Sequence, residues 1–262
     1  MKRILALSIV LLLILCGCGG GNDTGNASVT STSTKPTVPP NPYSLEDFSH
    51  NGKFMYCLTG ESHAGIDVSS HQGLIDWQQV KDYGVEFVFV RLGYRGYEYG
   101  NICQDEYALY NLTQAKAVGL QVGAYFFSQA VTEAEALEEA EFALGVLGSF
   151  QLDLPLVFDW EQMEADARTD QITKKELMPM IHAFCGKVKE AGYAPMVYFN
   201  PTLAETHLDM LDLMQYPFWL AAYSADKGTG FPYRVEFWQY SDNGTIPGIE
   251  KPVDLNIWLP AV

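Results

Sequence analysis

Positive charge is scarce in this 262-residue sequence, which has 16 lysine and arginine residues against 32 aspartate and glutamate residues and a formal net charge of −16. A nucleic-acid-binding protein needs a basic face that displaces counterions from phosphates. The shortage of basic residues therefore argues against a nucleic-acid partner. An acidic balance suits an extracellular enzyme, but it identifies no partner by itself.

Cysteine is also scarce, and only Cys57, Cys103 and Cys185 follow the N-terminal segment. An odd number of cysteines outside the cell permits one disulfide and one free thiol. Because Cys57 and Cys103 lie in predicted loops and Cys185 lies in a helical pattern, we expect Cys57 to pair with Cys103. Neither the cysteines nor the five histidines have the spacing of zinc ligands, so we expect no metal and no cofactor.

The hydrophobic run at the N-terminus, residues 4–15, is too short to span a bilayer. It follows Lys2 and Arg3, as in a secretory signal, and its end, LCGC at residues 15–18, resembles a bacterial lipobox. We therefore expect residues 1–17 to be a lipoprotein signal peptide and Cys18 to carry a lipid. This places the protein outside the cytoplasm, anchored to the cell membrane and facing the cell wall. An ordinary secretory signal is the alternative.

The region after the predicted anchor, residues 18–42, consists largely of Gly, Ser, Thr, Pro and Asn. Such a segment buries too little apolar surface to fold, so we expect a flexible tether. Residues 43–64 form a lead-in segment, and residues 65–262 are long enough for one catalytic domain with a substantial core.

Short apolar or aromatic runs alternate with longer amphipathic runs from residue 65 onward, which is typical of βα units. The predicted strands are residues 65–68, 87–92, 121–127, 154–160, 195–199, 218–222, 235–240 and 253–258. The predicted helices are residues 76–83, 104–118, 133–147, 173–191 and 202–211.

Predicted helices separate the first five strands but not the last three. Parallel neighbours need a crossover, usually a helix, so the last three strands are expected to include antiparallel pairing. The sequence thus predicts the α/β fold class, with an eight-stranded barrel that resembles a TIM barrel in a single domain.

Two carboxylates, Asp159 and Glu161, stand at the end of an apolar strand. Strand side chains alternate between faces, so these two share a face beyond a hydrophobic floor and beside Trp160. This is how a paired-carboxylate acid/base site is built. The alternative is that both are solvated residues in a loop.

Two further acids, Asp67 near the end of the first strand and Asp254 in the eighth, fall where a closed barrel would bring them to the same mouth. Taken singly, each suits a capping role or a salt bridge. Aromatic residues follow or end the other strands; taken singly they suit core packing, and together they suit a groove that stacks on sugar rings. Those of most interest are Tyr125, Tyr198, Trp219 and Tyr223.

Four motifs occur in order: GIDVSSHQG at residues 65–73, FDWE at 158–161, FWQY at 237–240 and VDLN at 253–256. Together they resemble the signatures of the glycoside hydrolase family 25 muramidases, over residues 65–259. The resemblance implies a flattened (β/α)5β3 barrel, which agrees with the predicted strands and helices. One departure is Phe126, where many members have a histidine; it questions a substrate contact but not the carboxylates.

The resemblance also implies cleavage of the β-1,4 bond between N-acetylmuramic acid and N-acetylglucosamine in peptidoglycan glycan strands. Glu161 is then the general acid, and Asp159 orients the substrate's N-acetyl group in substrate-assisted hydrolysis. Direct attack by an enzyme carboxylate, or water activation by Asp67 or Asp254, is the alternative. Tyr125, Tyr198 and Gln239 become substrate contacts, and Trp219 and Tyr223 stacking surfaces.

Two other functions stay open: a wall-binding lipoprotein without turnover, and a hydrolase of another N-acetylated glycan such as chitin. We expect the protein to act as a monomer.

Overall fold

A computed structural model describes residues 37–163 and 166–260. The predicted signal peptide, Cys18 and most of the predicted tether lie outside the described residues. Within the described ranges, none of the helices combines the length and apolar character that crossing a bilayer requires.

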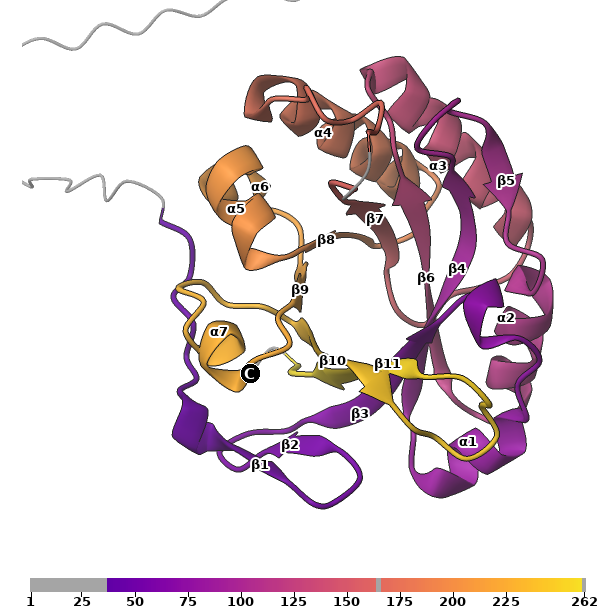
Figure 1. Cartoon of the computed structure of the whole chain (residues 1–262), viewed down its shortest axis with the longest axis vertical. Helices are drawn as coiled ribbons and strands as arrows, with labels where there is room; N and C mark the ends of the chain where they lie inside the picture. Colours follow the sequence, from indigo (N-terminus) through magenta and orange to yellow (C-terminus); the bar gives the residue numbers. More distant parts are fainter. Residues whose placement is uncertain (1–36, 164–165, 261–262) are drawn as a thin grey trace, which may run out of the picture. The chain divides into compact units, whose positions relative to one another are not determined.

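Eight strands close into a barrel, because the first strand pairs with both the last strand and the second. Around the barrel the order is β3-β11-β10-β9-β8-β7-β6-β4, and a short strand, β5, extends the sheet beside β4 (Figure 1). The strands are β3 (His63–Val68), β4 (Phe87–Arg95), β5 (Ile102–Gln104), β6 (Gln121–Ser128), β7 (Leu156–Trp160), β8 (Pro195–Phe199), β9 (Phe218–Ala221), β10 (Phe237–Gly244) and β11 (Val253–Trp258).

Helices connect the first five barrel strands and lie outside the barrel, which confirms the predicted βα order (Figure 1). The predicted helix at 202–211 is divided in two, and a short helix, α7, lies where no helical period was visible. The helices are α1 (Trp77–Tyr83), α2 (Ala108–Ala117), α3 (Glu133–Leu147), α4 (Lys174–Glu190), α5 (Pro201–His207), α6 (Met210–Leu213) and α7 (Ala225–Thr229).

Local sequence signals set several helix ends. Thr173 and Glu176 exchange hydrogen bonds in a capping box at the start of α4, which satisfies backbone N–H groups that have no partner in the helix. Gly84 ends α1 in a left-handed conformation with φ of 114°, which other residues adopt only with strain.

One strand of the barrel is reversed. β11 runs antiparallel to both β10 and β3, whereas the other neighbouring barrel strands run parallel. The predicted antiparallel pairing is therefore confirmed, but it is confined to the last strand. The reversal places the start of β11 at the mouth where the other strands end, so Asp254 lies directly opposite Asp67.

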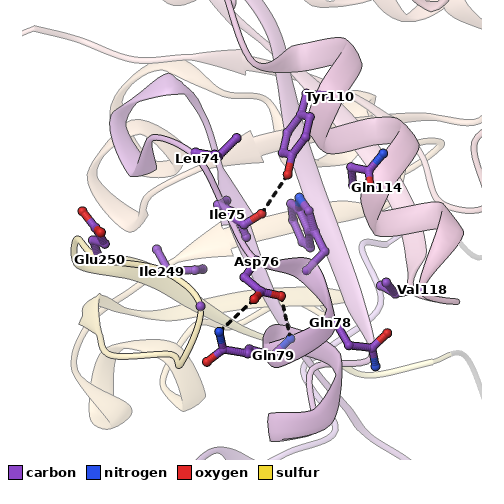
Figure 2. A pocket seen from close by; sticks show the side chains of 12 residues that line it. Leu74, Ile75, Asp76, Gln78, Gln79, Tyr110, Gln114, Val118, Ile249 and Glu250 are labelled. Carbon is purple, nitrogen blue, oxygen red and sulfur yellow. Dashed lines mark hydrogen bonds between the residues drawn. The ribbon is translucent and has the colours of Figure 1, made fainter.

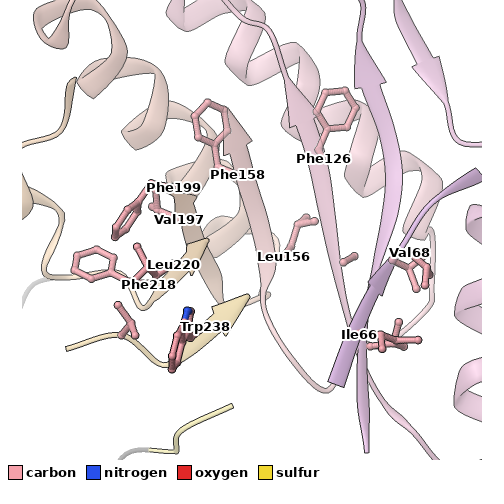
Figure 3. Close-up of a cluster of buried hydrophobic side chains, with 14 of the residues drawn as sticks. Ile66, Val68, Phe126, Leu156, Phe158, Val197, Phe199, Phe218, Leu220 and Trp238 are labelled. Atoms are coloured by element: carbon pink, nitrogen blue, oxygen red, sulfur yellow. The ribbon is translucent and has the colours of Figure 1, made fainter. Parts of the chain in front are cut away.

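Both faces of the barrel wall are buried. Aromatic side chains such as Phe87, Phe89, Trp219 and Phe237 fill the interior. The outward faces pack under the helices (Figure 3), as Leu156, Phe158 and Trp238 do. Each large side chain that is fully buried in this way stabilises the fold by about 1.5–3 kcal/mol, which makes the barrel a rigid support for the residues at its mouth.

The lead-in segment is structured, which the sequence did not indicate. It forms a hairpin of β1 (Phe48–His50) and β2 (Met55–Cys57), and Phe48 packs edge-on against Trp238. Upstream, the Asn41 side chain donates hydrogen bonds to the carbonyls of Thr229 and Phe231. The end of the predicted tether therefore lies against the domain.

The expected Cys57–Cys103 disulfide is wrong. Cys57 lies in the β1–β2 hairpin and Cys103 lies in β5, at the far side of the sheet (Figure 1). Cys185 lies in α4, and in the described part of the chain all three thiols are free. Burial raises the pKa of the Cys185 thiol, so it behaves as a small apolar residue.

Candidate active site

The four acids named from the sequence meet at one mouth of the barrel. They come from three strands: Asp67 from β3, Asp159 and Glu161 from the end of β7, and Asp254 from β11. They line a cleft of about 230 Å³. The described residues around it are Asp67, Ser69, His71, Gln72, Arg91, Tyr125, Phe127, Asp159, Glu161, Tyr198, Tyr223, Gln239 and Asp254.

Asp159 and Glu161 share the inner face, as strand alternation predicts. Val157 lies on the same face, in the interior cluster beneath them. Trp160 instead faces outward, and its indole N–H donates to the carbonyl of Ala130 at 3.1 Å. The expectation that the Trp160 ring lies beside Glu161 is therefore wrong, because the ring and the carboxylate are on opposite faces of the strand.

The environment of this pair favours protonation. Burial, followed by the charge of Glu161, raises the pKa of Asp159 well above its usual range. Burial also raises the pKa of Glu161, although a hydrogen bond from Asp159 offsets part of that effect. A carboxyl group with a raised pKa can hold a proton near neutral pH, which is what a general acid requires.

One oxygen of this pair lacks a partner. Asp159 is only 5 % exposed, yet its Oδ1 has no hydrogen-bond partner among the described residues. Buried polar atoms are nearly always satisfied, and leaving one unpaired costs about 1–3 kcal/mol. An orphan acceptor that lines a cleft is suited to a donor brought by a ligand.

The second pair, Asp67 and Asp254, is held by amides. The side-chain amides of Gln239 and Asn256 each donate to Asp67 Oδ2 at 2.8 Å. Burial and the nearby Asp67 raise the pKa of Asp254 to about 9. Burial also raises the pKa of Asp67, whereas the amide hydrogen bonds lower it. Asp254 therefore holds the proton of this pair, and Asp67 is its acceptor.

Gln239 connects the acids to the tyrosines. Its Oε1 accepts hydrogen bonds from the hydroxyls of Tyr198, at 3.2 Å, and Tyr223, at 3.0 Å. Tyr223 is 52 % exposed and lies at the rim, whereas Tyr125 and Tyr198 are buried in the cleft wall. These residues line the cleft as their predicted roles require.

Trp219 does not line the cleft. It is 1 % exposed, it stacks on Phe89 with ring centroids 4.6 Å apart, and its indole N–H donates to Asn256. The predicted stacking of substrate on Trp219 does not fit this burial. The Trp219 ring supports the cleft from below, because its N–H donates to Asn256, whose side-chain amide in turn donates to Asp67.

Arg91 is a cleft residue that the sequence reasoning missed. Phe87 and Phe89 face the interior, so Arg91 is the next inward position of β4 and reaches the mouth. Its guanidinium binds Asp105 at 2.9 Å and the hydroxyl of Ser70 at 3.2 Å. The positive charge of Arg91 within an otherwise apolar predicted strand was the signal in the sequence that could have identified it.

Phe126, the departure from the family pattern, faces away from the cleft. It is fully buried and packs against Phe142 of α3. The cleft residues of β6 are its neighbours Tyr125 and Phe127. Phe126 therefore occupies a position in the core, and its presence removes no contact from the cleft wall.

The cleft continues into a larger groove of about 1320 Å³, which shares Glu161, Tyr198 and Tyr223 with it. The loops after β8 and β9 line this groove, which suits an extended polymer. A separate hollow of about 650 Å³ lies over α1 and α2 (Figure 2). Of the two acids described in this hollow, Asp76 caps α1 through hydrogen bonds to Gln79 and Glu250 is exposed.

No group of three or more His, Cys, Asp or Glu side chains among the described residues could hold a metal ion. The cleft acids are instead paired with each other or with amides.

An eight-stranded α/β barrel with paired carboxylates in a long groove at its mouth defines a glycoside hydrolase. The model of glycosyl hydrolases family 25 matches residues 66–249. The chain belongs to this family.

Two sequence relatives illustrate the match. A protein of Escherichia coli K12 named YegX, described as uncharacterized, is 31% identical over 201 residues, which cover 74% of this chain and 68% of that protein. Lysozyme M1 of Streptomyces globisporus is 29% identical over 201 residues, covering 73% of this chain and 66% of that protein.

Solved structures agree. The autolysin LytC from Streptococcus pneumoniae, in complex with a synthetic peptidoglycan ligand, has a TM-score of 0.66 and 25% identity, covering 80% of this chain. The present chain spans 52% of the length of LytC. A lysozyme from Streptomyces coelicolor has a TM-score of 0.63 and 26% identity, covering 78% of this chain and 94% of that one.

Proposed function

We propose that this protein is an N-acetylmuramidase that cleaves the β-1,4 bond between N-acetylmuramic acid and N-acetylglucosamine in peptidoglycan. The observation that carries the proposal is the pair at the end of β7: Glu161, with a raised pKa, beside Asp159, with a buried acceptor that lacks a partner. The relatives named as lysozymes and the peptidoglycan ligand of LytC support this substrate class.

Glu161 acts as the general acid. Its proton passes to the glycosidic oxygen, and the bond from that oxygen to the anomeric carbon breaks, so the leaving sugar departs as a neutral alcohol. Asp159 and Glu161 share a proton through the hydrogen bond between them, and that proton must lie on Glu161 when the step begins. The carboxylate that remains afterwards can accept a proton from water in the second half of the reaction.

Asp159 serves the substrate's N-acetyl group. Its unpartnered Oδ1 accepts a hydrogen bond from the amide N–H, which directs the amide oxygen at the anomeric carbon. The new carbon–oxygen bond forms as the glycosidic bond breaks, and water then opens the cyclic intermediate. Two displacements at the same carbon retain its configuration.

Direct attack by Asp159, or activation of water by Asp67 or Asp254, is the competing mechanism. NMR of the freshly released sugar separates them in part: retention agrees with the substrate-assisted route or a covalent intermediate, whereas inversion requires a carboxylate that activates water. An inverted product would refute the role proposed for Asp159.

The substrate and the cleaved bond are tested together by digestion of purified peptidoglycan. Products are reduced with borohydride and identified by mass spectrometry, and chitin oligomers are digested in parallel. We expect reduced N-acetylmuramic acid at the new ends and little release from chitin. Reduced N-acetylglucosamine ends, release from chitin alone, or binding without release would each overturn the proposal.

We also propose that the enzyme is a lipoprotein attached through Cys18, with the tether letting it reach the wall from the membrane. A free tether of roughly twenty residues spans about 25 Å on average. In membrane fractions, mass spectrometry of the N-terminal peptide should find a diacylated Cys18, and Cys18→Ala should move the protein to the soluble fraction. An unmodified N-terminus at a later residue would contradict the anchor.

We also propose that the protein is a monomer, and sedimentation should find the mass of a single chain.

A further inference from the structure

Gln129 is a fully buried residue whose side-chain amide is hydrogen-bonded through both its nitrogen and its oxygen. It follows β6 directly and is 0 % exposed. Its Nε2 donates to the carbonyls of Ser128, at 3.0 Å, and Glu161, at 2.7 Å. Its Oε1 accepts the hydroxyl proton of Thr169 at 3.0 Å, and its backbone carbonyl accepts from Arg168 at 3.1 Å.

The hydrogen bond from Gln129 to the Glu161 carbonyl lies just beyond the end of the pairing between β6 and β7. The pairing between β6 and β7 ends with Ser128 opposite Trp160. Glu161 is the next residue, and its carbonyl receives its hydrogen bond from the Gln129 side chain instead of from a neighbouring strand. Since the backbone sets the direction of a side chain, this contact controls where the Glu161 carboxyl group points.

The orientation of the Gln129 amide is itself fixed. Thr169 is fully buried, and its hydroxyl donates to Oε1, so the amide presents its N–H groups toward Glu161. Arg168 binds both the Gln129 carbonyl and Glu135 of α3, at 2.6 Å. A chain of polar contacts thus runs from α3 to the backbone of Glu161.

We propose that Gln129 is a positioning residue for Glu161, and that Thr169 fixes the amide that does the positioning. The inference rests on the proposed function, in which Glu161 is the general acid. A misplacement of about 1 Å in a reacting group costs about 100-fold in rate. Gln129 should therefore affect turnover without touching substrate.

A merely space-filling role predicts a different result. If Gln129 only filled a buried volume, methionine of similar length would replace it with a loss of stability and no change in catalysis. If it positions Glu161, loss of the N–H donor frees the carboxyl group to hydrate. Hydration returns the pKa of Glu161 toward its ordinary value, so the alkaline limb of the rate profile moves to lower pH.

The test compares Gln129→Met, Thr169→Val and a matched control, Asn111→Leu, in the full-length protein. Asn111 is another fully buried amide, but it lies in α2 and accepts its hydrogen bond from Trp77. For each variant, kcat, KM and their pH profiles are measured on soluble peptidoglycan fragments, together with the melting temperature.

We expect Gln129→Met to lower kcat about 10- to 100-fold, with KM within about twofold and the alkaline limb shifted to lower pH. Thr169→Val should change kcat in the same direction by a smaller factor, and it decides the question if Gln129→Met fails to fold. Asn111→Leu should lose stability but keep its kcat and pH profile.

The inference is wrong if Gln129→Met has the kcat and pH profile of the wild type. If only Thr169→Val folds, the same result in that variant would overturn the inference. An equal loss of kcat in Asn111→Leu would also overturn it, because general loosening of the fold would then explain the effect. Glu161→Gln is assayed beside these variants. If Glu161→Gln retains turnover, the proposed role of Glu161 as general acid is wrong. If Glu161→Gln is inactive but Gln129→Met is fully active, only the positioning role of Gln129 is refuted.

Discussion

Two clusters of charged side chains in this protein are built in opposite ways. In the cleft, four carboxylates face one arginine, Arg91, which is already bound to Asp105. Outside the barrel, acids and arginines alternate in what we call the arginine cluster, which joins the end of β4, α3 and the segment near residue 168. Its members are Arg95, Glu135, Glu138, Glu139 and Arg168.

The pKa of Glu135 reflects this difference, whereas burial raises the pKa of Glu139 to about 7 in spite of Arg95. Burial acts to raise the pKa of Glu135, but hydrogen bonds from Arg168 and from the Val131 N–H outweigh it, and the pKa is lowered. The pKa values of Asp159 and Glu161 in the cleft are raised, because burial and neighbouring carboxylates act together. The arginine cluster therefore stabilises the fold, and the cleft holds acids at a cost to stability that catalysis requires.

The largest effect should come from Glu161→Gln. The amide cannot donate the acid's proton, so turnover on purified peptidoglycan should fall by about 10²- to 10⁴-fold, the usual contribution of general acid catalysis. Stability should be equal to wild type or higher. The assay counts new reducing ends, with Glu250→Gln as an exposed control outside the cleft. Near wild-type turnover in Glu161→Gln would contradict its role.

Arg95→Met should show the reverse pattern in the arginine cluster. Arg95 is 4 % exposed and binds Glu139, which is 0 % exposed, at 2.7 Å. Removing it should lower the free energy of unfolding by about 3 kcal/mol, the lower end for breaking a buried pair, because Glu139 can take up a proton. Urea titration measures this loss. Turnover per folded molecule should be unchanged.

The pair can be checked with a second variant. Glu139→Gln in the Arg95→Met background removes the isolated acid and should recover part of the lost stability. If the single Arg95 variant is as stable as wild type, or if it loses turnover instead, the assignment of this cluster to the framework is wrong.

Stability should also depend on pH through Glu139. Burial raises its pKa from 4.5 to about 7, although hydrogen bonds from Ser128 and Arg95 oppose the rise. The folded state then binds the proton more tightly than the unfolded state does. This contribution is complete below about pH 4.5, is lost as the pH rises through about 7, and amounts to roughly 3 kcal/mol. Urea titrations across this range should show a flatter profile for Glu139→Gln; an unchanged slope would refute the contribution.

Tyr223→Phe should have the smallest effect. Its hydroxyl donates to Gln239 at 3.0 Å, but the side chain is half exposed at the rim. Loss of one such hydrogen bond costs about 1 kcal/mol, or about fivefold in kcat/KM. Kinetics on soluble fragments test this, and Tyr198→Phe, which removes a buried hydroxyl bound to the same oxygen, should lose more. A larger loss in Tyr223→Phe would give the rim hydroxyl a direct role.

The sequence predicted the β-strand order and the cleft acids because those signals are local. Helix caps, glycines and apolar runs mark the elements, and the spacing of Asp159 and Glu161 fixes their common face. The closed barrel then brings Asp67 and Asp254 together, which needs only the order of the strands and the reversal of the last one.

Residues in strands buried on both faces were harder to place. Such strands are continuous hydrophobic runs, so alternation does not reveal which side chains face inward. Trp219 faces the interior and Trp238 faces the helices, yet both follow phenylalanine in similar runs. The hairpin of residues 48–57 was missed for another reason: its short strands are stabilised by packing on β10, which no local pattern records.

Asp159→Asn tests most directly whether the acids of the cleft contribute to catalysis while lowering the stability of the folded protein. Asparagine removes a buried carboxyl group whose pKa is raised by burial and by Glu161. Its neutral amide oxygen is a weaker acceptor than a carboxylate oxygen for the substrate amide that Asp159 is proposed to orient. We expect the free energy of unfolding at pH 7, measured in urea, to rise while turnover on peptidoglycan falls at least tenfold. A variant that is less stable than wild type but equally active would contradict this view of the cleft.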